Sequence, residues 1–429
     1  MELSVRIDSL AFGGCGVGRI AGKVVFVPYS APGDELRIEI TKKEKGFMEG
    51  TPIEVTSPSP IRKEPPCSYH SVCGGCHWLH IPYREQLKAK EGIFRDTLRR
   101  IGKIDPSIAQ PIQPSPTEFN YRSRVQLKVL EDKIGFYRRE SHELVDISEC
   151  PLAHPIINRI LSGLRKVWPR SLRSVTRVDI NVSPSDEKGI VGIFLKGKND
   201  FDFARFLKML NQAVPEVTGL VAHYGKEVQG YGSPHLFSQE GEFRLRASEG
   251  SFSQVNYSQN LNMKDYILSL AGLKGDEAVL ELYSGGGNFT IPLARAAGKV
   301  VGIEVSRSSI EDAIENAKMN GIRNATFIQA TAEKGLEKVV GAYSHTPLQD
   351  PKGTDLILVD PPRDGCSKKV IEGIVFLKPR KVIYVSCNPS TLARDLSRFQ
   401  ALGYKVRTSR PFDMFPQTYH IESVTEIVG

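Results

Sequence analysis

Cys387 is the residue of this sequence whose type and position best suit nucleophilic chemistry. It follows the apolar run of residues 381–385 and precedes Ser390 and Thr391, which begin a helical pattern, so it should lie at the carboxyl end of a strand. A thiol beside a helix amino terminus can have its pKa lowered toward the thiolate, the form that attacks electrophiles. On position alone, a buried structural cysteine is the better interpretation, because free cysteine is among the most buried residues.

Residues 281–288, Glu-Leu-Tyr-Ser-Gly-Gly-Gly-Asn, lead from the end of a predicted strand into a glycine-rich turn. Glycines let the backbone approach a ligand closely, and a helix amino terminus favours negative groups. Glu304 ends the next strand, nineteen residues after Gly285, where a carboxylate can bind both hydroxyls of a ribose. The dinucleotide fingerprint needs a further glycine where Thr290 stands, so a cofactor with one nucleoside and no pyrophosphate, such as S-adenosylmethionine, fits better.

The segment Asp360-Pro-Pro-Arg363 ends an apolar strand predicted over residues 356–359. Two prolines at a strand end fix the backbone, so both charged side chains should project into the crevice at the carboxyl edge of the sheet. The alternative is a turn that merely stops the strand. We favour a site, because the charged pair borders the predicted cofactor crevice.

Three cysteines on one loop, Cys67, Cys73 and Cys76, form a set of four thiols with the distant Cys150. Four thiolates complete a tetrahedral sulfur site, suited to an iron-sulfur cluster or to structural zinc. Zinc sites commonly use paired two-residue spacings, which this set lacks, so we favour a 4Fe-4S cluster that staples the loop to the central domain. Nearby histidines are interpreted as loop residues rather than ligands: His70, His77 and His80.

The elements that position these residues form three predicted domains, residues 1–56, 57–260 and 261–429. The first alternates short β-rich runs with Gly turns, which predicts a small antiparallel barrel. Its positive charges suit nucleic acid as well as they suit an ordinary soluble surface. A proline-rich linker follows at residues 57–66, and the amphipathic helix predicted over residues 83–101 can pack on the catalytic domain. The barrel cations are Arg19, Lys23, Arg37, Lys42, Lys43 and Lys45.

The central domain mixes strands with at least one helix. Near its start, Tyr121, Arg122 and Arg124 are suited to binding phosphate groups and stacking on bases. The alternative is that these arginines only make the surface soluble, as most surface arginines do. After residue 261 strands and helices alternate strictly, which predicts an α/β fold with a doubly wound parallel sheet. The predicted central elements are strands at residues 123–130, 133–137, 178–182 and 190–195 and a helix at residues 201–212.

Length and composition exclude several classes of protein. The chain has 429 residues, enough for two or three domains, and its formal charge of +8 permits a basic surface for an anionic partner without requiring one. No apolar run approaches the length of a membrane span and the first residues do not resemble a signal peptide, so we expect a cytoplasmic protein without a membrane partner. Seven cysteines, an odd number, argue against a disulfide framework.

Together these segments resemble the S-adenosylmethionine-dependent RNA uracil-5 methyltransferases, over nearly the whole chain. The start is similar to that family's TRAM barrel, and the four cysteines are similar to its 4Fe-4S motif. The resemblance implies a class I methyltransferase domain, an N-terminal OB-like barrel and a mixed α+β central domain that carries the cluster. The catalytic-domain motifs are matched by Phe252-Ser-Gln-Val-Asn256, Asp360-Pro-Pro-Arg363, Ser386-Cys-Asn-Pro389 and His420-Ile-Glu-Ser-Val424.

The resemblance also implies roles for single residues. Cys387 would be the nucleophile that adds to carbon 6 of uracil, and Glu422 the base that removes the proton from carbon 5 after methyl transfer. Without the motif around it, Glu422 would be interpreted as a strand carboxylate exposed to water. Thr331 departs from the amide or acid that relatives often carry at its position. The cofactor pocket would be lined by Gln254, Tyr283, Asn288, Glu304, Thr331 and Asp360.

The implied substrate is RNA whose target uridine leaves its stack to reach the pocket. Family members with both barrel and cluster mostly resemble 23S ribosomal RNA enzymes, so ribosomal RNA is favoured over transfer RNA, and a monomer is expected. Two rival hypotheses stay open. One is an RNA cytosine-5 methyltransferase, for which Cys366 lies in the wrong place and is interpreted as structural. The other is a non-enzymatic RNA-binding assembly factor, against which Cys387 and Glu422 speak.

Overall fold

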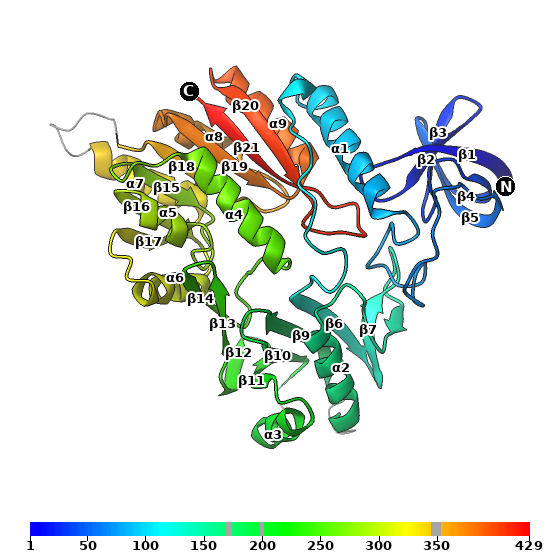
Figure 1. Ribbon diagram of the computed structural model, residues 1–429, viewed down its shortest axis with the longest axis horizontal. Helices are drawn as coiled ribbons and strands as arrows, with labels where there is room; N and C mark the ends of the chain where they lie inside the picture. The colour runs from blue at the N-terminus through cyan, green and yellow to red at the C-terminus, as the bar shows by residue number, and fades with distance from the viewer. Residues whose placement is uncertain (169–173, 198–200, 345–352) are drawn as a thin grey trace.

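The computed structural model describes residues 1–168, 174–197, 201–344 and 353–429. Their strands form a closed barrel, two seven-stranded sheets and a two-stranded sheet. Figure 1 shows helix α1 (Tyr83–Arg100) between the barrel and the C-terminal sheet, with the central sheet below both. Within this part of the chain, no helix combines the length and the apolar character needed to cross a bilayer.

The barrel closes in the order β1-β2-β3-β5-β4 around its own apolar core, which includes Val5, Val25 and Ile38. The prediction of an antiparallel barrel is wrong at one seam, where β3 and β5 pair in parallel. Five strands cannot alternate in direction all the way round a closed ring. The strands are β1 (Glu2–Leu10), β2 (Gly16–Ile20), β3 (Lys23–Val27), β4 (Glu35–Lys43) and β5 (Phe47–Ser57).

The positive charges of the barrel are matched by acidic residues. Arg37 forms ion pairs of 2.9 Å with both Glu2 and Glu54. Residues 1–56 contain seven lysines and arginines but eight aspartates and glutamates, which leaves one negative charge in excess. The cations predicted to stud this domain therefore do not make it electropositive.

The central sheet has the order β12-β11-β10-β9-β6-β7-β8, and helices α2 (Pro155–Val167) and α3 (Phe203–Ala213) pack on one face of it in a common core. The sequence pattern does not reveal β12, because its six residues are almost all exposed and show no alternation. The strands are β6 (Arg124–Leu130), β7 (Lys133–Tyr137), β8 (Leu144–Asp146), β9 (Val175–Ser183), β10 (Lys188–Leu195), β11 (Val217–Tyr224) and β12 (Glu227–Gly232).

The C-terminal sheet has the order β17-β16-β15-β18-β19-β21-β20. The predicted doubly wound parallel sheet is confirmed for β15 to β19, and β21 is inserted antiparallel between β19 and β20. The strands are β15 (Ala278–Leu282), β16 (Lys299–Glu304), β17 (Ala325–Gln329), β18 (Leu356–Val359), β19 (Lys381–Ser386), β20 (Lys405–Phe412) and β21 (Glu422–Val428). The helices are α4 (Tyr257–Ala271), α5 (Thr290–Ala296), α6 (Arg307–Met319), α7 (Ala332–Ser344), α8 (Lys368–Phe376) and α9 (Pro389–Ala401).

Helix α1 joins the core of the C-terminal sheet. Phe94 and Leu98 are fully buried in the same cluster as Phe399 of α9, and the short helix η1 (Pro106–Ile108) follows beside β20. The Lys90 ammonium is also fully buried and lies 2.6 Å from the Asp413 carboxylate. A buried cation of this kind requires its partner, so α1 and the segment before β21 are held to each other.

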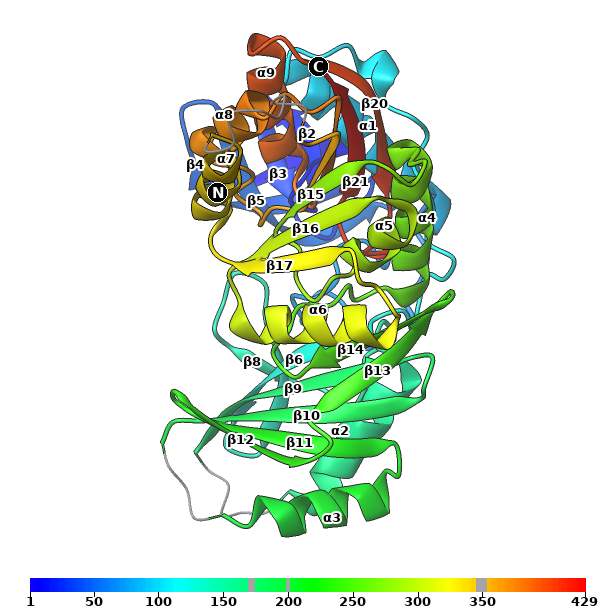
Figure 2. The same ribbon diagram turned by 90° about the vertical axis from the view of Figure 1, so that its left-hand side faces the viewer.

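A hairpin of β13 (His235–Glu240) and β14 (Phe243–Ser248) lies against α6, between the two large sheets (Figure 2). The Asp312 carboxylate of α6 is fully buried and accepts hydrogen bonds from the Arg246 side chain, the Ser248 amide and the Ser251 hydroxyl, each of 2.8 Å. These bonds fix the hairpin, and with it the segment that leads from β14 to Gln254, on the C-terminal sheet.

Candidate active site

The register of the C-terminal sheet aligns three predicted site residues at its carboxyl edge. The last residue of β15 pairs with Ile303 of β16 and with Val359 of β18. The residues that follow, Tyr283, Glu304 and Asp360, therefore stand at one level at the ends of three adjacent strands. This edge is where doubly wound sheets bind their ligands.

The turn after β15 depends on its glycines and is braced by Glu304. Tyr283, Gly285 and Gly287 have φ values of +64°, +54° and +88°, a region that glycine enters freely and tyrosine only at a cost. The Gly285 amide donates to the Glu304 carboxylate over 3.1 Å, and the Ser306 amide donates to it over 2.7 Å. The turn and the predicted ribose-binding carboxylate thus form one unit.

Asn316 connects this turn to the hairpin, and sequence reasoning missed it. Its side-chain amide donates to the Gly286 carbonyl over 2.8 Å and to the Arg246 carbonyl over 3.0 Å, while its oxygen accepts from the Arg246 amide over 2.6 Å. A signal existed in the sequence, because Asp312, Asn316 and Asn320 repeat at a spacing of four and form a polar stripe on one face of α6.

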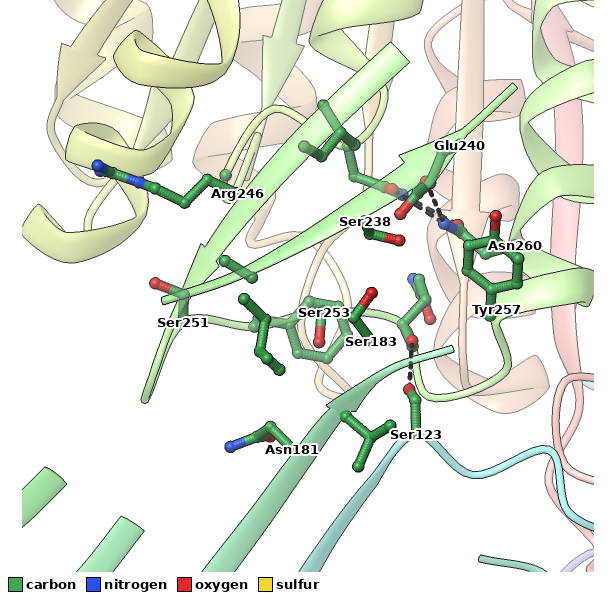
Figure 3. A pocket seen from close by; sticks show the side chains of 18 of the residues that line it. Ser123, Asn181, Ser183, Ser238, Glu240, Arg246, Ser251, Ser253, Tyr257 and Asn260 are labelled. Atoms are coloured by element: carbon green, nitrogen blue, oxygen red, sulfur yellow. Dashed lines mark hydrogen bonds between the residues drawn. The ribbon is translucent and has the colours of Figure 1, made fainter. Parts of the chain in front are cut away.

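An open pocket of about 830 Å³ lies beside the turn, and Gln254 and Asn288 are among its lining residues. Asn288 and Asn260 exchange two hydrogen bonds of 3.0 Å. Figure 3 shows Glu240 and Asn260 on one side of this pocket and Asn181 of the central sheet on the other. The crevice at the sheet edge therefore continues toward the central domain.

Thr331 lies apart from this pocket, just after β17 on the same edge of the sheet as Glu304. Its side chain is exposed, and its hydroxyl accepts a hydrogen bond of 3.4 Å from the Lys334 amide at the start of α7. The contact is that of a helix cap at the start of α7.

Cys387 and Glu422 lie at the same end of two adjacent antiparallel strands. The pairing of β19 with β21 ends with Ser386 opposite Ser423, Cys387 is the residue that follows β19, and Glu422 is the first residue of β21. Both Glu422 and Asp360 are close enough to raise the pKa of the Cys387 thiol. Glu422 is only 6% exposed, so it is not a solvated strand carboxylate.

The Cys387 thiol is not a preformed thiolate. Burial raises its pKa to about 12, Glu422 and Asp360 add to the rise, and Arg363 opposes it. The expected lowering of this pKa is wrong, because lost hydration and two nearby carboxyl groups outweigh the helix amino terminus. Burial likewise raises the pKa of Asp360 to about 7 and that of Glu422 to about 8, with Asp360 adding to the latter.

The segment that carries Arg363 is tied to α9, the helix that begins after Cys387. The fully buried Asp395 carboxylate accepts from the Cys366 amide over 2.8 Å and from the Tyr384 hydroxyl over 2.9 Å. The Thr391 hydroxyl donates to the Arg363 carbonyl over 3.1 Å. The segment beside Cys387 is thus fixed by contacts within the C-terminal domain itself.

The charges at this edge fit a cationic ligand. Burial raises the pKa of Glu281 to about 8, and Asp360 and Glu304 contribute to the rise. Carboxyl groups that raise one another's pKa stabilise a positive charge placed among them. S-adenosylmethionine carries a sulfonium and an ammonium group, and its nucleoside needs a glycine turn with a carboxylate beside it. The residues present therefore fit this cofactor.

A second site is formed by the four predicted cluster ligands. Cys67, Cys73, Cys76 and Cys150 all line one open cavity of about 590 Å³, and all four are free thiols. Burial raises the pKa of Cys73 to about 11, and Cys150 and Cys67 add to the rise, as neighbouring sulfurs do. Among the residues that the structure describes, no group of three or more His, Cys, Asp or Glu side chains is arranged so that it could hold a metal ion.

Arg122 faces the cysteine cavity rather than an RNA-binding surface. It lines that cavity, and its guanidinium lies 5.9 Å from the Phe415 ring. Tyr121 is 5% exposed and donates to the Pro416 carbonyl over 3.0 Å. The predicted role in base stacking is therefore wrong for the buried Tyr121. The half-buried Arg122 guanidinium beside four thiols fits an anionic sulfur ligand set, and in this respect the residues present fit an iron-sulfur cluster.

Comparison with known proteins identifies the family. A sequence model of tRNA (uracil-5-)-methyltransferases matches residues 82–427, and a model of the TRAM domain of tRNA (uracil(54)-C(5))-methyltransferase matches residues 3–61. The chain belongs to the RNA uracil-5 methyltransferase family. It is similar to uncharacterized RNA methyltransferases of Aquifex aeolicus, at 35% identity, and of Thermosynechococcus vestitus, at 33%. Both alignments cover 98% of this chain and 97% of the relative.

A solved structure of the same family has the same architecture. The Pyrococcus abyssi tRNA (uracil-54, C5)-methyltransferase, in complex with S-adenosyl-L-homocysteine, superposes with a TM-score of 0.76 at 25% identity. The similarity covers 99% of this chain and 100% of that one, so the barrel, the central sheet and the C-terminal sheet are all included.

Proposed function

We propose that this protein methylates carbon 5 of a uridine in RNA with S-adenosylmethionine as the methyl donor. Family membership supports the reaction class. The observation that carries the proposal is the pairing of β19 with β21, which brings Cys387 and Glu422 to adjacent strand ends at the edge where Glu304 and Asp360 also lie. Addition to a pyrimidine ring and elimination from it require a thiol and a base side by side.

Cys387 is the nucleophile in this reaction. Carbon 5 of uracil is too weak a nucleophile to take a methyl group unaided, so the Cys387 sulfur first adds to carbon 6 and leaves an electron pair on the enolate. Bound S-adenosylmethionine supplies the methyl group to carbon 5. That carbon still bears its hydrogen, and removal of the proton restores the double bond and expels the Cys387 sulfur.

Glu422 is the base that takes the proton from carbon 5. Because the pKa of Glu422 is raised to about 8, its carboxyl group holds a proton in most protein molecules at pH 7. This proton must leave before Glu422 can act as a base. The Cys387 thiol must also be deprotonated, and Arg363 is a positive group that favours its thiolate. Positive charge bound at this edge lowers the pKa values of the thiol and of both carboxyl groups, and so favours the reactive forms.

RNA that contains 5-fluorouridine tests this function. Fluorine cannot leave as a proton, so the wild-type protein should form an adduct with the RNA that survives denaturing electrophoresis. Cys366→Ala, a buried thiol outside the proposed chemistry, should form the same adduct, whereas Cys387→Ala should not. A wild-type protein that forms no adduct and transfers no labelled methyl group would be an assembly factor rather than an enzyme. Label in cytosine instead of uridine would identify the rival methyltransferase.

The class of RNA has two candidates. The barrel and the cysteine motif favour 23S ribosomal RNA by resemblance. The Pyrococcus abyssi enzyme, a tRNA methyltransferase by its name, is nevertheless similar over its whole length, barrel included, so the barrel does not separate the two RNAs. We therefore treat ribosomal and transfer RNA as equal candidates. Mapping 5-methyluridine in both RNAs of the host, with and without this protein, assigns the substrate.

We propose that Cys67, Cys73, Cys76 and Cys150 hold a 4Fe-4S cluster. Their convergence on one cavity beside the Arg122 guanidinium supports it. Protein purified without oxygen should be brown and should contain about four iron and four sulfide ions per chain. Cys73→Ser should lose both. Colourless protein with one zinc ion per chain would contradict the cluster.

A further inference from the structure

A row of aromatic rings runs from the barrel to the proposed active site. Phe12, in the turn between β1 and β2, has its ring centroid 5.2 Å from that of Tyr419. The loop that carries Cys67, Cys73 and Cys76, called the cysteine loop below, contributes His77, whose ring lies 4.7 Å from that of Tyr419. The His420 ring lies 4.3 Å from the Tyr419 ring. Three segments that are far apart in the sequence thus contribute to one row of rings, and His420 is two residues from Glu422.

Backbone contacts hold these three segments in place. The Trp78 ring N–H donates to the Gly14 carbonyl over 3.1 Å, which docks the β1–β2 turn on the cysteine loop. The turn is so close that a Cβ atom on Gly14 would lie 2.8 Å from the His77 ring. The His77 and Trp78 amides both donate to the Gln417 carbonyl over 3.1 Å, which docks the cysteine loop on the segment before β21.

The row presents ring surface to solvent. Phe12 is 36% exposed, and Tyr419, His77 and His420 are half-buried. The barrel carries no excess of positive charge, and stacking on ring surface is the other means by which proteins hold single-stranded nucleic acid, because every base has a π-face.

We propose that Phe12 and Tyr419 form a stacking platform for an unpaired nucleobase of the RNA, adjacent in the strand to the target uridine. The inference rests on the proposed function, because the row ends beside Glu422. A base held between the barrel and residue 419 leaves its neighbour free to reach Cys387. Its stacking offsets part of what the target base loses when it leaves its own stack.

Steady-state kinetics of the full-length protein, purified without oxygen, test the platform. Unmodified transcripts of the host transfer RNA and of its 23S ribosomal RNA are first tested with the wild type. The transcript that the wild type methylates is then used for all variants. Phe12→Ala and Phe12→Leu should each raise the KM for RNA about tenfold, the effect of removing one stacking ring. Phe12→Tyr should keep the wild-type value, because it keeps the ring. None of the three should change the KM for S-adenosylmethionine.

Two further variants separate stacking from general packing. Tyr419→Phe should keep the wild-type KM for RNA and Tyr419→Leu should raise it. Phe376→Ala, which removes a ring that is 68% exposed on α8, should change neither KM. The platform is overturned if Phe12→Leu leaves the KM for RNA unchanged, or if Phe12→Tyr raises this KM as much as Phe12→Leu does. In either case, methylation by the wild type would still support the proposed function. A wild type that methylates neither transcript refutes the proposed function, and the platform falls with it.

Discussion

Glu422 is expected to set the pH dependence of turnover. A carboxyl group with a pKa of about 8 is about one tenth ionised at pH 7 and about nine tenths ionised at pH 9. Because only the carboxylate can take the proton from carbon 5, kcat/KM, which reports groups of the free enzyme, should rise at least tenfold between these pH values. Asp360 lies close enough to titrate with it, so the rise belongs to the pair of acids rather than to one of them.

Glu422→Gln separates the steps of the reaction. The amide keeps the shape of the side chain but cannot accept the proton, so addition and methyl transfer should proceed while elimination fails. Turnover should fall about 10²–10⁴-fold, the usual contribution of a positioned base. The variant also lacks the negative charge that helps to raise the Cys387 pKa, so above pH 8, where Glu422 of the wild type is ionised, the thiolate should form more readily in the variant.

Denaturing gels of enzyme mixed with unmodified RNA, between pH 6 and pH 9.5, measure the adduct while release of labelled methylated RNA measures turnover. Glu426→Gln is the matched control, because Glu426 lies on the same strand and pairs with Lys381 over 3.1 Å, away from the carboxyl edge. Turnover of Glu422→Gln within about threefold of the wild type, or a flat wild-type profile between pH 7 and pH 9, would refute a role for Glu422 as the base.

Three other outcomes are expected. Lys90→Met should lower the free energy of unfolding by about 3–5 kcal/mol in denaturant titrations, because it leaves Asp413 buried and unpaired, and adding Asp413→Leu should recover most of that loss. Asn316→Ala should weaken S-adenosylhomocysteine binding in calorimetry without changing the KM for RNA, whereas the exposed Lys318→Ala should change neither. Glu422→Gln should melt at a higher temperature than the wild type at pH 8 but at a similar one at pH 4. A carboxyl group with a raised folded-state pKa stabilises the fold below its ordinary pKa, and that contribution is lost as pH rises toward about 8.

The cofactor edge could be predicted from sequence because its parts are local. A strand, a turn and the start of a helix lie within a few residues of one another, and the strand predicted at residues 278–282 is β15. Glu304 and Asp360 each end such a strand, so the carboxyl edge of a parallel sheet collects them wherever the strands fall in its order.

The partner of Cys387 could not be predicted in this way. Its place depends on β21, which enters the sheet antiparallel between β19 and β20, and a slip of one residue would turn Glu422 to the other face. The direction of the Cys387 pKa was also out of reach. It depends on burial and on charges brought in by two other strands, whereas the sequence displays only the adjacent helix.

The two groups proposed to act on the uridine are positioned by different parts of the molecule. The strand before Cys387 and the helix after it are joined within the C-terminal domain, because Asp395 of α9 accepts a hydrogen bond from Tyr384 of β19. Glu422 begins β21 shortly after residues 413–417, which contact α1, the cysteine loop and the central domain. Lys90 binds Asp413, the amides of residues 77 and 78 bind Gln417, and residue 121 binds the carbonyl of residue 416. The nucleophile therefore depends on one domain, whereas the base depends on contacts with elements that precede that domain in the sequence.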